Sequence, residues 1–145
     1  MRQLSQASIF VCWATLAAFP SVSSASTLLE CKPGARKLEY VKASYLVRTP
    51  DKRRLQQQLA TWGGAKRYDV YGQRGEDGSV ARRETWTSVL VSPRRGVRIE
   101  VQFTDGRQTA FVRVKNQCWN HPEDWQQHWQ RFQSTMSSWG YRRTG

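Results

Sequence analysis

The feature that most constrains the fold is a regular alternation of apolar and polar residues in the middle of the chain. It occurs in residues 85–91, 97–103 and 108–115, and in the second segment valine, isoleucine and phenylalanine alternate with arginine, glutamate and glutamine. A period of two residues is typical of strands with one buried and one exposed face. The connections favour antiparallel pairing, because residues 92–96 contain proline and glycine and Asp105-Gly106 is a tight-hairpin sequence. The alternation therefore predicts an antiparallel meander.

A strand and a short helix are predicted on the N-terminal side of the meander. Residues 38–48 alternate like a strand, and residues 49–51 combine a capping hydroxyl, a proline and an acid, as at a helix start. The apolar residues that follow at helical spacing are Leu55, Leu59 and Trp62. Gly63 and Gly64 are expected to end this helix. Residues 68–71 are then predicted to form a short strand, and the glycine-rich residues 72–79 a mobile loop.

A second amphipathic helix is predicted near the C-terminal end. Residues 120–124 contain an asparagine cap, a proline and two acids, and Gly140 is expected to end the helix. Large apolar side chains recur at helical spacing between these limits: Trp125, Trp129, Phe132, Met136 and Trp139. We interpret this stripe as core that covers one face of the sheet, rather than as a stacking platform for single-stranded nucleic acid. The predicted fold class is therefore α+β, an antiparallel sheet with two helices.

Residues 1–25 are predicted to be a cleaved signal peptide. They combine Arg2, an apolar run over residues 9–19 and small residues at Ser23 and Ala25, which is the pattern that a signal peptidase reads. The apolar run is well short of the ~20 residues that span a bilayer, so we expect no transmembrane segment in the mature chain. Cleavage after Ala25 would leave residues 26–145 as a single α+β domain, in the periplasm or secreted.

The cysteine content fits an oxidising compartment. Cys12 lies within the predicted signal peptide, so Cys31 and Cys118 remain in the mature chain. Two cysteines in an exported domain most simply form one disulfide, and neither belongs to the Cys-x-x-Cys pair of a redox enzyme. A Cys31–Cys118 disulfide would fasten the N-terminal segment to the residues before the last helix.

The chain is strongly basic, with a formal net charge of +12 and more arginines than lysines. Because arginine makes bidentate contacts with carboxylates and phosphates, this charge indicates either an anionic partner or a solvated basic surface. Paired arginines fall in two predicted loops, and loops on a rigid sheet commonly carry recognition residues. The predicted contact residues are these arginines and two aromatic anchors: Arg82, Arg83, Arg94, Arg95, Trp86 and Tyr71.

Motifs that carry catalytic chemistry are sparse. His121 and His128 are the two histidines, and Asp124 lies between them, a set that could bind zinc or act as acid and base in a small nuclease. The spacing differs from the His-Glu-x-x-His of zinc proteases, and helix-start or surface histidines are the alternative interpretation. The sequence also lacks a nucleophile elbow, a phosphate-binding glycine loop and a dinucleotide fingerprint. We therefore expect no metal site and no cofactor, and the sequence favours a binding protein over an enzyme without excluding an enzyme.

Together these features favour a small exported binding protein that neutralises a toxin or hydrolase, in the manner of an inhibitor or immunity protein. Its partner would be an acidic protein, toward which the arginine-rich loops steer association. Two other hypotheses remain open. One is binding of an anionic polymer such as nucleic acid, lipopolysaccharide or glycan. The other is a small secreted nuclease or hydrolase that uses His121 or His128.

Overall fold

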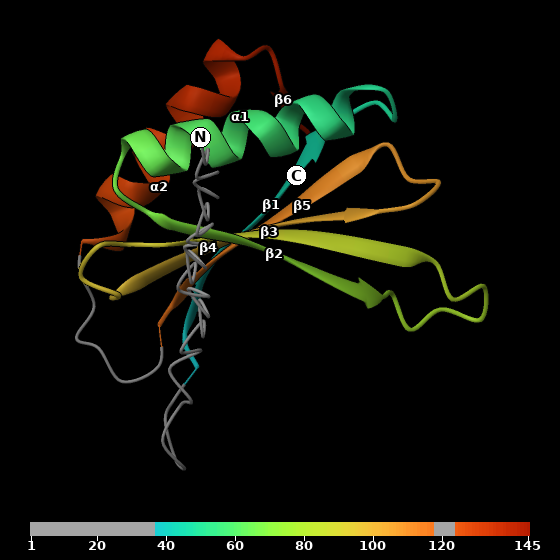
Figure 1. The fold of residues 1–145 in the computed structure, drawn as a ribbon, viewed down its shortest axis with the longest axis horizontal. Helices are drawn as coiled ribbons and strands as arrows, with labels where there is room; N and C mark the ends of the chain where they lie inside the picture. Colours follow the sequence, from blue (N-terminus) through green and yellow to red (C-terminus); the bar gives the residue numbers. More distant parts are fainter. Residues whose placement is uncertain (1–36, 118–123) are drawn as a thin grey trace, which may run out of the picture.

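Six antiparallel strands and two helices make up the fold (Figure 1). The computed structural model describes residues 37–117 and 124–145. The elements in chain order are β1 (Glu39–Leu46), α1 (Asp51–Ala65), β2 (Asp69–Glu76), β3 (Glu84–Val91), β4 (Val97–Thr104), β5 (Thr109–Asn116), α2 (Trp125–Ser138) and β6 (Arg142–Arg143). Both helices lie on the same side of the sheet (Figure 1). This arrangement confirms the predicted α+β fold class.

The strand order in the sheet is β2-β3-β4-β5-β1-β6. Strands β2 to β5 form consecutive antiparallel hairpins, which confirms the meander. Strand β1 pairs with β5 at the far side of the meander, so α1 carries the chain back across the sheet to β2. The sequence did not predict β6, whose Arg142 and Arg143 pair with Leu46 and Tyr45 of β1.

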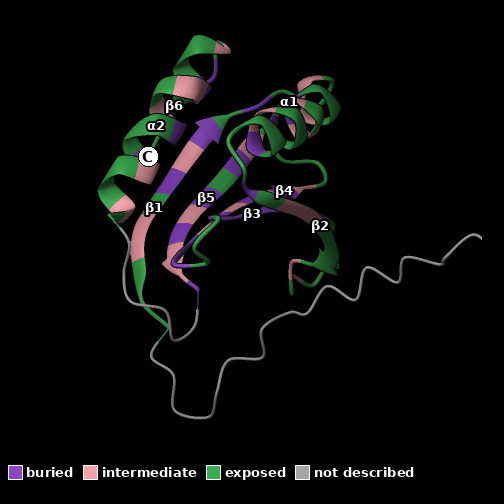
Figure 2. Ribbon diagram, turned by 60° about the vertical axis from the view of Figure 1, so that its left-hand side comes forward, coloured by how far each residue is buried: buried purple, intermediate pink, exposed green. Residues whose placement is uncertain are grey.

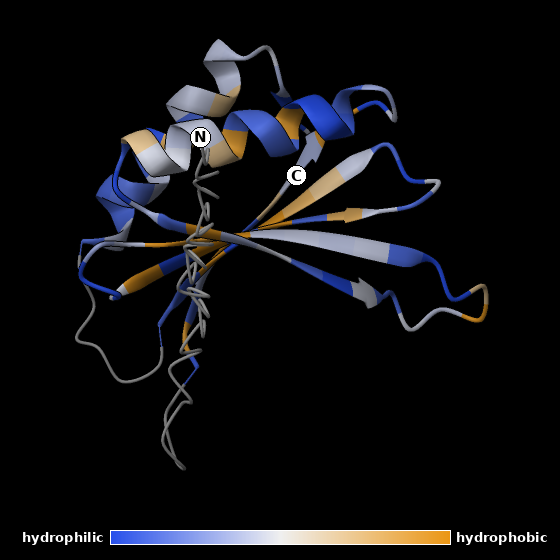
Figure 3. Cartoon of the chain, in the orientation of Figure 1, coloured by the Kyte–Doolittle hydropathy of each residue, from blue (hydrophilic) through white to orange (hydrophobic). Residues whose placement is uncertain are grey.

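The hydrophobic core lies between the sheet and the two helices (Figures 2 and 3). The strand registers place Ile99 beside both Leu90 and Val114, and Val101 beside Val112. Apolar residues of neighbouring strands therefore form rows beneath the helices, and all five of these side chains are fully buried. Figure 3 shows hydrophobic residues concentrated in the centre of the sheet, with mostly hydrophilic loops at its two ends.

The apolar stripe of α2 belongs to this core, as predicted. All five of its residues are buried or partly buried against the cluster, and Phe132 and Met136 are fully buried. The Phe132 ring meets Tyr45 of β1 edge-on with ring centroids 6.4 Å apart, and Trp62 of α1 with centroids 6.1 Å apart. Phe132 therefore joins α2 to both β1 and α1. The helix ends where predicted, with Gly140 in the left-handed region at φ +86°.

The end of α1 differs from the predicted one, because Gly63 and Gly64 lie inside the helix. The helix closes with a Schellman motif, in which the Tyr68 amide donates to Gly63 O at 2.8 Å and the Arg67 amide to Gly64 O at 3.0 Å. Arg67 takes the left-handed conformation, φ +63°, that glycine usually supplies at this position. Gly63 serves packing instead, since a Cβ there would lie 2.4 Å from a methyl group of Val70.

The two helix starts also differ from each other. The predicted hydroxyl cap at Thr49 is wrong, because Pro50 occupies the N-cap position of α1 and no side chain of the described residues caps the helix. In α2 the Asp124 carboxylate accepts a hydrogen bond from the Gln127 amide at 3.2 Å. An acid that caps the first turn also complements the positive end of the helix dipole.

Residues 72–79, predicted as a mobile loop, are mostly β-strand. Strand β2 continues to Glu76 and stays paired with β3 along its whole length. Gly72 is a packing residue, because a Cβ there would lie 2.1 Å from the Trp86 indole. The chain then turns around Asp77, whose carboxylate accepts hydrogen bonds from the amides of Ser79 at 3.0 Å and Arg83 at 3.2 Å.

Several predictions fall on residues 1–36 and 118–123, which lie outside the described ranges. These are the signal peptide, the Cys31–Cys118 disulfide and any role of His121. All three stay predictions. Within residues 37–117 and 124–145, neither helix has the length and apolarity that crossing a bilayer requires.

The sheet face turned away from the helices is polar and carries an ion cluster. The carboxylate of Glu100 lies 2.8 Å from Arg98 Nε and 2.8 Å from Lys115 Nζ, and its side chain is only 15% exposed. Arg113 is its cross-strand neighbour on β5. Burial acts to raise the pKa of Glu100, but the adjacent ammonium and guanidinium groups outweigh burial and hold the pKa below its ordinary value of 4.5.

Stability is therefore expected to depend on the charge of Glu100. Because its folded-state pKa is the lower one, the ionised carboxylate stabilises the fold above the unfolded-state pKa, and this contribution is lost as pH falls through the folded-state value. Glu100→Gln should lower the free energy of unfolding by about 1–2 kcal/mol near neutral pH. Urea titrations over a pH series from neutrality into the acid range should show this difference shrinking toward zero as the Glu100 carboxylate becomes protonated.

Glu39→Gln is the matched control, since its carboxylate makes a more exposed pair with Lys42 at 3.6 Å. Glu39→Gln should change the free energy of unfolding by less than about 0.5 kcal/mol at every pH of the series. A loss for Glu100→Gln that stays constant over the whole pH series would contradict the assignment of the effect to the charge of Glu100.

Candidate functional site

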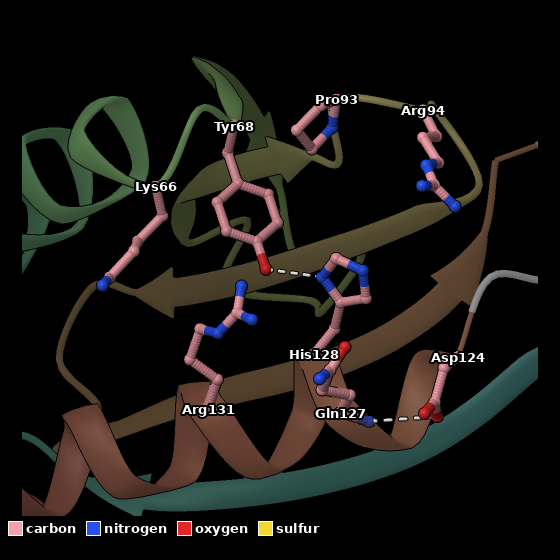
Figure 4. A pocket seen from close by; sticks show the side chains of 8 residues that line it. All are labelled: Lys66, Tyr68, Pro93, Arg94, Asp124, Gln127, His128 and Arg131. Carbon is pink, nitrogen blue, oxygen red and sulfur yellow. Dashed lines mark hydrogen bonds between the residues drawn. The ribbon is translucent and has the colours of Figure 1, made fainter.

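A basic pocket lies where the C-terminal end of α1, the β3–β4 turn and the start of α2 meet (Figure 4). Its volume is about 390 Å³, within the range of small-molecule sites. The lining residues are Lys66, Tyr68, Pro93, Arg94, Asp124, Gln127, His128 and Arg131. They come from three segments that are distant in sequence, so only the folded chain assembles the pocket.

A tyrosine–histidine pair lies at the centre of the pocket. The Tyr68 hydroxyl and His128 Nδ1 are hydrogen-bonded at 2.6 Å, and the two rings meet edge-to-face with centroids 5.7 Å apart. Tyr68 is only 4% exposed, so its hydroxyl needs such a partner. The Schellman motif at the end of α1 positions Tyr68, and α2 positions His128. The pair therefore fixes α2 against the connection between α1 and β2.

Cationic side chains surround this pair. Figure 4 shows Lys66 from the end of α1, Arg131 from α2 and Arg94 from the β3–β4 turn around Tyr68 and His128. Among the described lining residues, Asp124 supplies one carboxylate, which also caps α2. No ion pair is present for Lys66 or Arg131 among residues 37–117 and 124–145. The pocket therefore has an excess of positive charge and attracts anions.

The turn that carries Arg94 is held by Ser92, whose side chain is fully buried. Its hydroxyl accepts hydrogen bonds from the amides of Gly96 and Val97, both at 3.1 Å. The Arg95 amide donates to Ser92 O at 2.7 Å, and Arg95 takes a left-handed conformation at φ +55°. These contacts close a tight turn with proline at its second position. These hydrogen bonds fix the backbone of the turn, and the turn sets the position from which the Arg94 side chain extends.

The structure does not bring the four predicted loop arginines together. Arg94 lines the basic pocket, and Arg95 lies on the same turn. Arg82 and Arg83 lie in the β2–β3 connection, at the opposite end of the eight-residue strand β3. A strand of that length spans about 26 Å. Figure 1 shows these two connections at opposite ends of the sheet.

The two predicted aromatic anchors lie on opposite faces of the sheet, and neither lines the basic pocket. Trp86 lies on the helix side against Gly72, with the Arg74 guanidinium carbon 5.6 Å from its ring centroid. Tyr71 lies on the polar face, where the Arg98 guanidinium carbon is 5.8 Å from its ring centroid. Tyr71 and Trp86 therefore cannot contact a single partner group together.

Of the two histidines, His128 lines the pocket and His121 lies outside the described ranges. The hypothesis of a site formed by both histidines is therefore untested. Asp124, the acid between the histidines, caps α2. Among the described residues, no group of three histidine, cysteine, aspartate or glutamate side chains is placed to hold a metal ion.

Sequence reasoning identified Arg94 and His128 but missed the other basic and buried groups of the pocket. Lys66 and Tyr68 follow directly after the glycine pair, where the sequence predicted the end of a helix and a short strand. Arg131 follows His128 at a spacing of three, which places both on one helix face. That spacing was the one local signal of the pocket in the sequence.

Comparisons with protein-family models, curated proteins and solved structures find no match to this chain. The chemistry of the pocket therefore carries the functional proposal. A concave site with excess positive charge, a hydroxyl–imidazole pair and the side-chain amide of Gln127 has the chemistry to attract an anion and to orient it through hydrogen-bond donors.

Proposed function

We propose that this protein is an exported inhibitor or immunity-type protein, and that its basic pocket binds an acidic side chain of a protein partner. The observation that carries the proposal is the placement of Lys66, Arg94 and Arg131 around the Tyr68–His128 pair. A carboxylate held in a concave site loses water, and charge-assisted hydrogen bonds there are strong and directional. The pocket would thus hold one acidic anchor of the partner.

The overall charge and the predicted export support the same function. A formal net charge of +12 speeds encounter with an acidic protein. Toxins and hydrolases released by cells act outside the cytoplasm, where the predicted signal peptide would deliver this chain.

Mass spectrometry of the exported protein should show a chain that begins at Ser26, with Cys31 and Cys118 oxidised. An uncleaved chain with reduced cysteines would contradict export.

The pocket is tested by removing two of its charges. The tagged mature chain is used to isolate its partner from the exported fraction, and affinity is then measured with the purified partner. Lys66→Gln with Arg131→Gln should weaken binding by at least about thirtyfold, because the partner's acidic group loses its charged donors. Circular dichroism verifies that the variant is folded.

Arg82→Gln with Arg83→Gln is the matched control, since it removes the same charge at the opposite end of β3. It should weaken binding by no more than about threefold, the effect of a distant charge on association rate. Equal losses for the two double variants would contradict a specific role of the pocket. Failure to recover any partner protein would contradict the inhibitor function.

Binding of an anionic polymer is the second candidate, and the polar sheet face favours it. That face carries a group of cationic side chains on and beside the Glu100 carboxylate: Lys42, Arg98, Arg113 and Lys115. Polymer binding through such a face would weaken steeply with salt and depend little on the kind of polyanion. A protein partner anchored in the pocket would keep most of its affinity over the same salt range. A titration at two salt concentrations therefore separates the two functions.

A further inference from the structure

A second pocket lies on the polar face of the sheet, around an exposed phenylalanine. Phe111 of β5 is 44% exposed, while its neighbours Ala110 and Val112 point into the core and are fully buried. The pocket has a volume of about 490 Å³ and lies at the end of the sheet that carries the β2–β3 and β4–β5 connections. It is therefore on the opposite face, and at the opposite end, from the basic pocket.

The walls around Phe111 are formed by polar side chains of moderate size. Gln102 is the cross-strand neighbour of Phe111, and Thr104 and Thr109 supply hydroxyl groups beside it. Ser79 of the β2–β3 connection lines the same pocket. Amide and hydroxyl groups both donate and accept hydrogen bonds. This wall therefore suits a ligand that carries several hydroxyl groups.

Two arginines of the pocket retain donors for an anionic group. Among the described residues, Arg113 Nε is buried and has no hydrogen-bond partner, and its guanidinium carbon lies 6.0 Å from the Phe111 ring centroid. Buried donors in proteins usually have a hydrogen-bond partner, such as a ligand group or a water molecule. Arg107 also lines the pocket and makes no ion pair with any residue of the described ranges. Each guanidinium can pair with a carboxylate in a bidentate manner.

Two nearby carboxylates limit how much negative charge a ligand of this pocket can carry. Asp77 is engaged by its own connection, because its carboxylate accepts from Ser79 N at 3.0 Å, Ser79 Oγ at 2.5 Å and Arg83 N at 3.2 Å. These hydrogen bonds hold the pKa of Asp77 below its ordinary value, so the group stays ionised. Glu76 adds a second carboxylate at the rim. A ligand with several negative charges, such as a nucleotide, would be repelled by both acids.

We infer that the Phe111 pocket binds an acidic sugar, with one face of the sugar ring on Phe111 and its carboxylate on Arg113 and Arg107. An aromatic ring has a negative face, which attracts the C–H groups of a sugar ring. The amide and hydroxyl side chains would then bind the sugar hydroxyls. A single carboxylate can pair with the Arg113 guanidinium, and with one negative charge it meets less repulsion at Glu76 and Asp77 than a phosphate does.

The site is tested by NMR titration of the isotope-labelled mature chain with three probes, namely glucuronate, glucose and uridine monophosphate. Glucuronate should shift the backbone amides of Gln102, Phe111 and Arg113. Glucose, which has the same ring without the carboxylate, should bind at least about fivefold more weakly. Phe111→Ala should weaken glucuronate binding about tenfold, because it removes the ring that the sugar contacts.

Leu46→Ala is the matched control, since Leu46 is also an exposed apolar residue on the sheet, at 36%, and does not line the pocket. It should leave glucuronate binding unchanged. Absence of shifts with glucuronate, shifts confined to residues outside the pocket, or tighter binding of uridine monophosphate at Phe111 would each overturn the inference. Because Lys66 and Arg131 lie in the other pocket, their double variant should bind glucuronate normally, whether or not the inhibitor function holds.

Discussion

Phe132→Ala is expected to lower the free energy of unfolding by about 3–5 kcal/mol. The ring is fully buried and contacts Tyr45 of β1, Trp62 of α1 and Trp129 of α2, so truncation leaves a cavity between three elements. Neither helix can close this cavity without losing other contacts with the sheet. Urea titration followed by tryptophan fluorescence measures the loss.

Ser134→Ala on the same helix is the control for this substitution. Ser134 is exposed, so its replacement should change the free energy of unfolding by less than about 0.5 kcal/mol. A loss of less than about 1 kcal/mol for Phe132→Ala would show that the ring is not the central contact between α2 and the rest of the core.

Gly63→Ala is expected to destabilise the protein by about 1–2 kcal/mol, although alanine in place of glycine normally favours a helix. A Cβ at this position would lie 2.4 Å from Val70 Cγ2 and 3.1 Å from Leu90 Cδ2. Val70 is β-branched and cannot easily rotate away. The substitution should therefore push α1 off β2 and β3, and thermal or urea unfolding measures the cost.

The adjacent glycine provides the matched comparison. Gly64 lies in the same helix, and no atom of a described residue would lie within 4 Å of a Cβ at this position. Gly64→Ala should raise the free energy of unfolding by about 0.5–1 kcal/mol, through helix propensity alone. Stabilisation by both substitutions would contradict the close approach of α1 to the sheet at Gly63.

The sequence predicted the parts of the fold that repeat with a regular period. Strands β4 and β5 and helix α2 each bury one face, so their apolar residues recur at the spacing of the element that contains them. The predictions of a helix end and of a loop were wrong where tertiary packing, rather than a turn, requires glycine. Gly63 allows α1 to approach Val70, and Gly72 leaves room for Trp86, and neither contact is visible locally.

The basic pocket was predicted less well than the fold, for a related reason. Lys66, Tyr68 and Arg131 come from separate segments, and each fits a local pattern of an ordinary surface or core residue. Only the Schellman motif after α1 and the packing of α2 bring Tyr68 within 2.6 Å of His128. The pairing of β1 with β5 was missed in the same way, because it joins residues about 70 positions apart and has no sequence period.

Strand β2 is the last strand at one side of the sheet, and its composition has a consequence for self-association. An outermost strand offers backbone donors and acceptors that a strand of another molecule can pair with. Here Gly72 and Gly75 give an added strand no side chain to pack on, and Arg74 and Glu76 carry charge. The same glycines that resemble a loop in the sequence thus oppose edge-to-edge aggregation of the folded chains.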